Sequence, residues 1–153
     1  MADNIYNERI KFLAHRQMDI AEDQDYVSWA IMELMTGNES DSINILAGLL
    51  PPFNHFEVDI YVKKSLKEMA IPENTDFLDL YVEILARRRL ANEITSLEIT
   101  EEMYNIFVYS SFNSKYSQWS IINEYYDDYY LVSDRNIEDV IVEECKRIID
   151  HSI

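Results

Sequence analysis

The chain has 153 residues, of which 48% are hydrophobic and 27% are charged, so it belongs with globular proteins and not with disordered chains. Its 29 acidic and 13 basic residues give a formal net charge of −16. Because each contact with a nucleic-acid phosphate needs a cation, this charge argues against direct nucleic-acid binding. The only glycines, Gly37 and Gly48, are too far apart for a dinucleotide fingerprint or a phosphate-binding loop.

Cysteine content and hydropathy indicate the cellular compartment in which the protein is expected. Cys145 is the only cysteine, so it has no partner for an intramolecular disulfide, and a reducing compartment is expected. The first residues lack the apolar run of a signal peptide, and no segment approaches the roughly 20 apolar residues that span a bilayer. We therefore expect a cytoplasmic protein that does not enter a membrane.

The first third of the chain predicts helices. One helix spans about residues 4–22. Over 26–35, apolar residues recur at helical spacing and predict a buried stripe of Val27, Ala30, Ile31 and Leu34. Asp23 and Asp25 precede this second segment and can cap it. Gly37 follows it and suits a left-handed C-terminal cap.

The next two helices are delimited by turn residues. A short helix over about 42–50 is expected to stop at Pro51-Pro52, because proline lacks a backbone donor and clashes with the preceding turn. Asn54 and Glu57 have the spacing of a capping box. The helix that they open is expected to end before Pro72.

The segment 75–93 predicts the most deeply buried helix. Its apolar residues cover roughly two-thirds of the helical circumference. Asp79, Glu83 and Arg87 form a narrow polar stripe, in which Glu83 and Arg87 make a favourable i,i+4 pair. A helix that is apolar over so much of its surface is packed by several neighbours, so we place it at the centre of the fold.

The rest of the chain completes an all-α protein. A helix capped by Thr95-Ser96-Leu97-Glu98, or by Thr100, runs to about Phe112. Two more follow over 116–132 and 136–151, the last with Cys145 on its apolar stripe. No Asn-Gly or Asp-Gly turn between alternating strands indicates a β-hairpin. Since no Ser-, Pro- or Gly-rich linker interrupts the chain, we predict one domain over 1–153, a compact bundle of about seven helices.

Residues with catalytic potential are scattered. His15, His55 and His151 lack the i,i+3 or i,i+4 spacing to histidine or glutamate that helical metal sites use. The chain also lacks a Gly-x-Ser-x-Gly nucleophile elbow. We therefore predict no catalytic residue, no cofactor and no metal site, and a protein that is not an enzyme. A metal-dependent enzyme built from converging carboxylates remains an alternative.

Basic residues are missing from two long tracts. One lies between Arg16 and Lys63, and the other lies between Arg89 and Arg135, where Lys115 is the only base. The acidic residues of the two tracts are Asp19, Glu22, Asp23, Asp25, Glu33, Glu39, Asp41, Glu57 and Asp59, then Glu93, Glu98, Glu101, Glu102, Glu124, Asp127, Asp128 and Asp134. If the tracts fold together, they form a continuous negative surface that complements a basic partner. The alternative is two solvated faces.

The sequence "INEYYDDYYLV" places two pairs of tyrosines around two aspartates. On a helical wheel, Tyr126 and Tyr130 share a stripe with Trp119 and Ile122, which predicts that these rings fill the core. The side chains that remain for a partner are Tyr125, Asp127, Asp128 and Tyr129. Together with Asp23 and Asp25, they are the predicted partner-binding residues, because tyrosine beside acid combines rigid contact area with steering charge.

The run from Tyr26 to Ile71 resembles a pattern in small, uncharacterised, acidic all-helical bacterial proteins. Its matching elements are Trp29-Ala30, Gly37, Ser42, Leu46-Ala47-Gly48-Leu49, Asn54 and Phe56-Glu57-Val58, which are packing and capping residues. In size, acidity and Tyr-Asp content, the whole chain is similar in character, though not in motif, to bacterial immunity proteins that block nuclease toxins. The likeness implies a protein that binds a toxin domain.

Three functions follow from these observations. The first is a non-catalytic inhibitor of the immunity type, whose acidic, tyrosine-containing face blocks a basic protein partner such as a nuclease toxin. The second is a helical scaffold or adaptor, with self-association left open. The third is an inhibitor that mimics the charge of nucleic acid.

Overall fold

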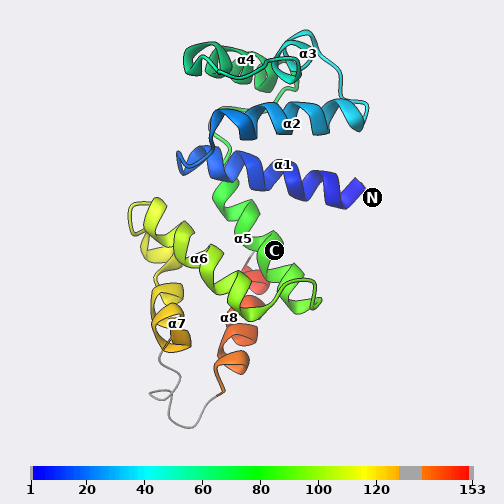
Figure 1. Cartoon of the computed structure of the whole chain (residues 1–153). Helices are drawn as coiled ribbons and strands as arrows, with labels where there is room; N and C mark the ends of the chain where they lie inside the picture. The colour runs from blue at the N-terminus through cyan, green and yellow to red at the C-terminus, as the bar shows by residue number, and fades with distance from the viewer. Residues whose placement is uncertain (1, 128–135, 152–153) are drawn as a thin grey trace. The chain divides into compact units, whose positions relative to one another are not determined.

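The computed structural model describes residues 2–127 and 136–151, and for Ala2, Asp3 and Asp127 it describes the backbone alone. These residues are all-helical, as the sequence predicts, and contain eight α-helices where about seven were expected (Figure 1). The chain divides into two compact units, Met1–Phe77 and Leu78–Ile153. The single domain predicted for 1–153 stays a prediction, because two packing units can still unfold as one cooperative system.

The first unit contains four helices: α1 (Ala2–Gln17), α2 (Asp23–Met35), α3 (Asp41–Ala47) and α4 (His55–Glu68). Within this unit, α2 lies between α1 and the pair formed by α3 and α4 (Figure 1). Its buried core consists of Phe12, Leu13, Trp29, Ala30, Ile43, Leu46, Val58, Val62 and Leu66. All four helices contribute to this core, so the unit has a hydrophobic centre of its own.

The C-terminal end of α2 confirms the role predicted for Gly37. Gly37 has a φ of +88°, and its amide donates to the carbonyl of Leu34, while the amide of Asn38 donates to the carbonyl of Glu33. These two bonds form a Schellman motif, which satisfies carbonyls at the end of the helix. The turn also brings the side chain of Asn38 to the carboxylate of Glu33.

The other predicted caps are confirmed in part. Asn54 caps α4 by accepting hydrogen bonds from the amides of Phe56 and Glu57, but within the described residues Glu57 does not make the reciprocal bond that would complete the predicted capping box. At α2, however, the N-cap is Glu22, and Asp25 closes a capping box by accepting from the Glu22 amide at 2.8 Å. Asp23 is already the first helical residue. The chain thus enters the helix one residue earlier than the aspartates suggested.

The apolar stripe of α2 differs from the one predicted. Val27 and Ala30 are buried, but Ile31 is 43% exposed, and Trp29 and Glu33 take the buried positions instead. Glu33 is fully buried because four side-chain donor atoms from three residues surround its carboxylate. Helical periodicity alone assigns a charged residue to the exposed side, so this position needed the tertiary contacts.

The second unit contains α5 (Phe77–Leu90) except for its first residue, Phe77, which belongs to the first unit. It also contains α6 (Ser96–Tyr109), a 3₁₀ helix η1 (Ser114–Tyr116), α7 (Gln118–Asp127) and α8 (Ile137–His151). Within this unit α6 contacts η1 and α7, and α7 contacts α8. Its buried hydrophobic residues are Leu78, Tyr81, Val82, Ile84, Leu85, Ala86, Ile99, Met103, Ile106, Tyr116, Trp119, Ile122, Ile141 and Cys145.

Helix α5 supplies six of those buried residues, which agrees with its predicted apolar circumference. Glu83 and Arg87 form the expected i,i+4 ion pair at 2.6 Å. At the following turn, Thr95 and Glu98 form a reciprocal capping box that begins α6. Cys145 is fully buried on α8, and burial raises the pKa of its thiol to about 12, so it acts as a small core residue.

Within the described residues, none of the helices combines the length and the apolar character that a membrane span requires.

Candidate functional site

The predicted residues Asp23 and Asp25 lie at an acidic N-terminal end of α2, which we call the α2 acidic end and define as Asp19, Glu22, Asp23 and Asp25. The N-terminus of a helix carries partial positive charge, so carboxylates are stabilised there. Asp23 also accepts a hydrogen bond from Nδ1 of His55 at 2.9 Å. This contact joins the first turn of α4 to the first turn of α2.

The same contact changes the protonation of His55. The hydrogen bond and the charge of Asp23 raise the pKa of the imidazole above its usual value of 6.5, and the charges of Asp59 and Asp19 add to the effect. Because the ring is exposed, it exchanges protons with solvent freely. Below the pKa of His55, the protonated imidazole therefore offsets part of the negative charge of the α2 acidic end. Above that pKa, the offset is lost.

Beside the α2 acidic end, a groove of about 370 Å³ runs between α1 and α2. The rings of Phe12 and Trp29 stack in its floor with centroids 4.7 Å apart, and the ring of Tyr26 packs edge-on against Phe12. The polar residues that line the groove are Glu8, Lys11, His15, Asp25 and Ser28. Stacked aromatic rings with carboxylates at the rim suit an inserted apolar or cationic side chain.

Three acidic residues of the first base-free tract have side-chain partners within the unit. Glu33 binds Arg9, Asp59 binds Lys63 at 2.9 Å and Arg16 at 3.7 Å, and Asp23 binds His55. The other six are exposed and form no ion pair in the part of the chain that the structure describes: Asp19, Glu22, Asp25, Glu39, Asp41 and Glu57. The first tract is thus a negative surface in which three of the nine acidic residues have partners within the unit.

The second base-free tract lies in the second unit, and its one base is already engaged. Lys115 Nζ binds both carboxylate oxygens of Asp79, at 2.9 and 2.7 Å. Glu93 lies 3.5 Å from Arg88. Exposed Glu101 and Glu124 make no ion pair among residues 2–127 and 136–151. The two tracts belong to different units, so the continuous negative surface that is expected if they fold together stays a prediction.

The helical wheel placed most of the described rings of α7 correctly. Trp119 and Ile122 are 1% and 0% exposed, whereas Tyr125 is 40% exposed, as expected for a residue that leans outward. Tyr126 is half-buried, so it belongs to the edge of the core. Of the predicted partner-binding residues, Asp128, Tyr129 and the side chain of Asp127 lie outside the described residues, as does Tyr130 of the core stripe.

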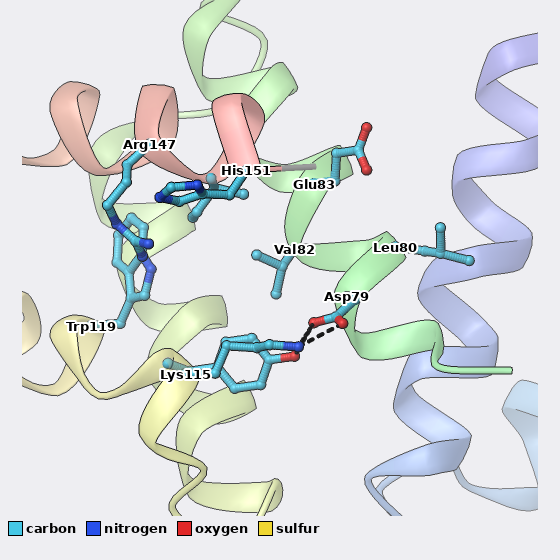
Figure 2. Close-up of a pocket in the computed structure, with 10 residues that line it drawn as sticks. Asp79, Leu80, Val82, Glu83, Lys115, Trp119, Arg147 and His151 are labelled. Carbon is cyan, nitrogen blue, oxygen red and sulfur yellow. Dashed lines mark hydrogen bonds and ion pairs between the residues drawn. The ribbon is translucent and has the colours of Figure 1, made fainter. Parts of the chain in front are cut away.

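The second unit also contains a pocket of about 330 Å³. Figure 2 shows Val82 between the Lys115–Asp79 pair and the side chains of Arg147 and His151. The ionic groups around it are engaged with protein: Asp79 also accepts from the Tyr116 hydroxyl, and Arg147 donates to Glu144. An entering ligand must compete with these bonds, so the pocket carries less free charge than its residues suggest.

Two features of unit 1 were not predicted. The first is the aromatic cluster at the groove, in which Phe12 and Trp29 line the floor and Tyr26 packs against Phe12. The i,i+3 spacing of Tyr26 and Trp29 was a visible signal of this cluster. The pairing of Arg9 with Glu33 joins residues 24 positions apart, for which no local pattern exists.

Comparisons place the chain in no known group. Searches of protein-family models, curated proteins and solved structures found no match to it. The likeness to immunity proteins therefore remains one of composition and size. Among the described residues, no group of three or more His, Cys, Asp or Glu side chains has the geometry to hold a metal ion.

Proposed function

We propose that this protein is a non-catalytic binding protein of the immunity or inhibitor type, which uses acidic surface to block a basic protein partner such as a nuclease toxin. The observation that carries the proposal is the set of six exposed acidic residues in the first unit that have no ion-pair partner in the described chain. Unpaired surface carboxylates keep their full attraction for an external cation. Such charges accelerate association and select partners of opposite sign.

The α2 acidic end and the adjoining groove support a specific mode of contact. The carboxylates would attract the partner, while the groove between α1 and α2, with the largely buried rings of Phe12 and Trp29 at its base, offers room for one inserted side chain. Interfaces gain most of their affinity from such central aromatic contacts, and the surrounding charge contributes mainly to rate and specificity. A lysine or arginine inserted between Glu8 and Asp25 would use both features.

The exposed tyrosine of α7 supports a second contact area in the other unit. Tyr125 and Ile121 are 40% and 43% exposed, and they lie one helical turn apart beside Glu124. Tyrosine next to acid offers rigid contact area together with hydrogen bonding. We assign this surface to the same partner class because its charge has the same sign.

The test is affinity capture with the α2 acidic end neutralised. The wild-type chain and the variant Asp23→Asn/Asp25→Asn are used as bait at 0.05 and 0.5 M salt, and captured proteins are assayed for nuclease activity with and without added bait. Asparagine keeps a side-chain acceptor for the bonds to His55 and the Glu22 amide, so the fold is preserved. The control, Asp139→Asn/Asp150→Asn, removes two charges from α8.

The expected result is a basic partner whose activity is inhibited, whose capture falls with salt, and whose capture falls further with the α2 variant than with the control. Capture that does not change with salt contradicts the proposal, as does the absence of any basic partner. An equal loss with both variants would show that net charge alone, without the α2 acidic end, drives binding.

A further inference from the structure

A groove of about 650 Å³ in the first unit is lined mainly by basic and apolar residues, whereas the rest of that unit is rich in acidic residues. It is formed by the end of α1, the second half of α4 and the segment that follows α4. Its lining residues are Arg16, Lys63, Leu66, Lys67, Ala70, Ile71, Pro72, Glu73 and Phe77. Three of these residues are cations and only one is an acid, in a chain whose net charge is −16.

The cations of this groove are not fully neutralised. Arg16 and Lys63 share the single carboxylate of Asp59, at 3.7 and 2.9 Å. Lys67 is exposed and forms no ion pair in the described part of the chain. Three cations against the two carboxylates of Asp59 and Glu73 leave a local positive charge that an anionic ligand can use.

The apolar part of the groove is held by backbone and side-chain bonds. Ala70 has a φ of +57°, and the amide of Ile71 donates to the carbonyl of Leu66, which turns the chain back at the end of α4. Gln17 accepts a hydrogen bond from the amide of Phe77 at 2.9 Å. These contacts fix Ile71 and Phe77, both half-buried, in the groove wall.

The exposed face of α4 extends the groove in one direction. Phe56 and Ile60 are 80% and 51% exposed, and at 100° per residue they lie on the same stripe as Lys63 and Lys67. From Phe56 to Lys67 this stripe is about 16 Å long at 1.5 Å per residue. An extended peptide rises about 3.3 Å per residue, so the stripe matches about five residues of a peptide.

We propose that this groove, together with the exposed stripe of α4, binds an acidic peptide segment in which carboxylates flank an apolar residue. The carboxylates contact Lys67 and the pair of cations around Asp59, and the apolar side chain contacts Ile71, Phe77 or the stripe residues. The rest of the chain repels such a peptide only weakly at contact, because charges are screened over about 8 Å at 0.15 M salt.

The experiment measures fluorescence anisotropy of a labelled peptide of alternating glutamate and phenylalanine at 0.15 M salt. A peptide with lysine in place of glutamate serves as the opposite-charge probe. The variant Lys67→Glu reverses the free cation, and Lys67→Gln removes its charge with less effect on the end of α4. Lys146→Glu on α8 makes the same charge change in the other unit and serves as the matched control.

We expect the glutamate peptide to bind in preference to the lysine peptide. Lys67→Glu should weaken binding about tenfold or more, Lys67→Gln should weaken it less, and Lys146→Glu should leave it within about twofold. Phe56→Ala should also weaken binding, since it removes apolar contact from the stripe. No binding of the glutamate peptide, equal effects of Lys67→Glu and Lys146→Glu, or preference for the lysine peptide would each overturn the proposal.

Discussion

Arg9 donates two hydrogen bonds to the buried carboxylate of Glu33, from Nε to Oε1 at 2.6 Å and from Nη2 to Oε2 at 2.7 Å. Nε1 of Trp29 and Nδ2 of Asn38 complete the shell around the same carboxylate, at 3.1 and 2.7 Å. Four donor atoms thus compensate the loss of solvent around Glu33. The network ties α1, α2 and the turn after α2 to one buried charge.

Loss of the arginine should destabilise the fold, because a buried carboxylate would keep its charge without its cation. We expect Arg9→Met to lower the free energy of unfolding by about 3 kcal/mol, and Arg9→Met/Glu33→Met to restore part of it. Urea unfolding followed by circular dichroism at 222 nm measures both. Arg87→Met, which breaks the exposed pair with Glu83, is the matched control, with a cost of less than about 1 kcal/mol. Equal losses for Arg9→Met and Arg87→Met would refute the role of burial.

The same carboxylate should make the protein sensitive to acid. Burial alone would raise the pKa of Glu33, but the hydrogen bonds from Arg9, Asn38 and Trp29 and the charge of Arg9 outweigh burial and hold it below its usual value of 4.5. A lowered folded-state pKa gives stability that is present above pH 4.5 and is lost as the pH falls through the folded-state value. Thermal unfolding between pH 3 and 7 should therefore show a smaller acid-induced loss in Glu33→Gln than in the wild type. Parallel curves would contradict this assignment.

His55 should titrate above its usual pKa of 6.5, because Asp23 stabilises the charged imidazolium. Its stabilising contribution is present below pH 6.5 and is lost as the pH rises through the higher folded-state pKa. Proton NMR of the imidazole gives the pKa directly. Asp23→Asn should move it down towards 6.5, whereas Asp139→Asn, in the other unit, should not move it. A His55 pKa that does not change in Asp23→Asn would show that this contact does not raise it.

Two aromatic residues of α7 should differ in their effect on stability. Trp119 is 1% exposed, so Trp119→Ala should cost about 3–5 kcal/mol, whereas Tyr125→Ala, at a residue that is 40% exposed, should cost less than about 1 kcal/mol. Denaturant unfolding of the two variants measures the difference. If Tyr125→Ala is also severely destabilising, the outward assignment of Tyr125 is wrong, and with it the proposed contact area on α7.

The single-domain prediction can be tested because each unit contains one buried tryptophan, Trp29 in the first and Trp119 in the second. In Trp29→Phe, the remaining fluorescence reports the second unit while circular dichroism at 222 nm reports both, and Trp119→Phe reverses the roles. One cooperative domain requires that the two signals coincide in each variant. Separate midpoints within one variant would show that the units unfold independently.

Local patterns anticipated much of the secondary structure. Asn54, the Thr95–Glu98 box and Gly37 were placed at their helix ends from short-range chemistry alone, and the structure confirms these three. The apolar circumference of α5 likewise predicted a largely buried helix, and six of its residues are buried. The N-cap of α2 was missed, since Glu22 is a less usual cap than the aspartates beside it.

The candidate site was anticipated less well than the helices. Charge counting identified the base-free tracts, but it could not show that Glu33, Asp59 and Asp23 have partners within the fold. It also missed the cationic groove, whose residues come from α1, α4 and the segment after α4. Ion-pair partners and groove residues of this kind come from distant positions in the sequence, and no rule on residue spacing predicts which of them meet.

By itself, the sequence determined the helical class, the approximate beginnings of most helices and the strong excess of negative charge, because each depends on residue type or on neighbours within a turn or two. The tertiary structure alone decided which charges are buried, which are paired and which remain exposed. The physical reason is that an ion pair such as Arg9 with Glu33 acts over a few ångströms, and only folding brings residues 24 positions apart to that distance.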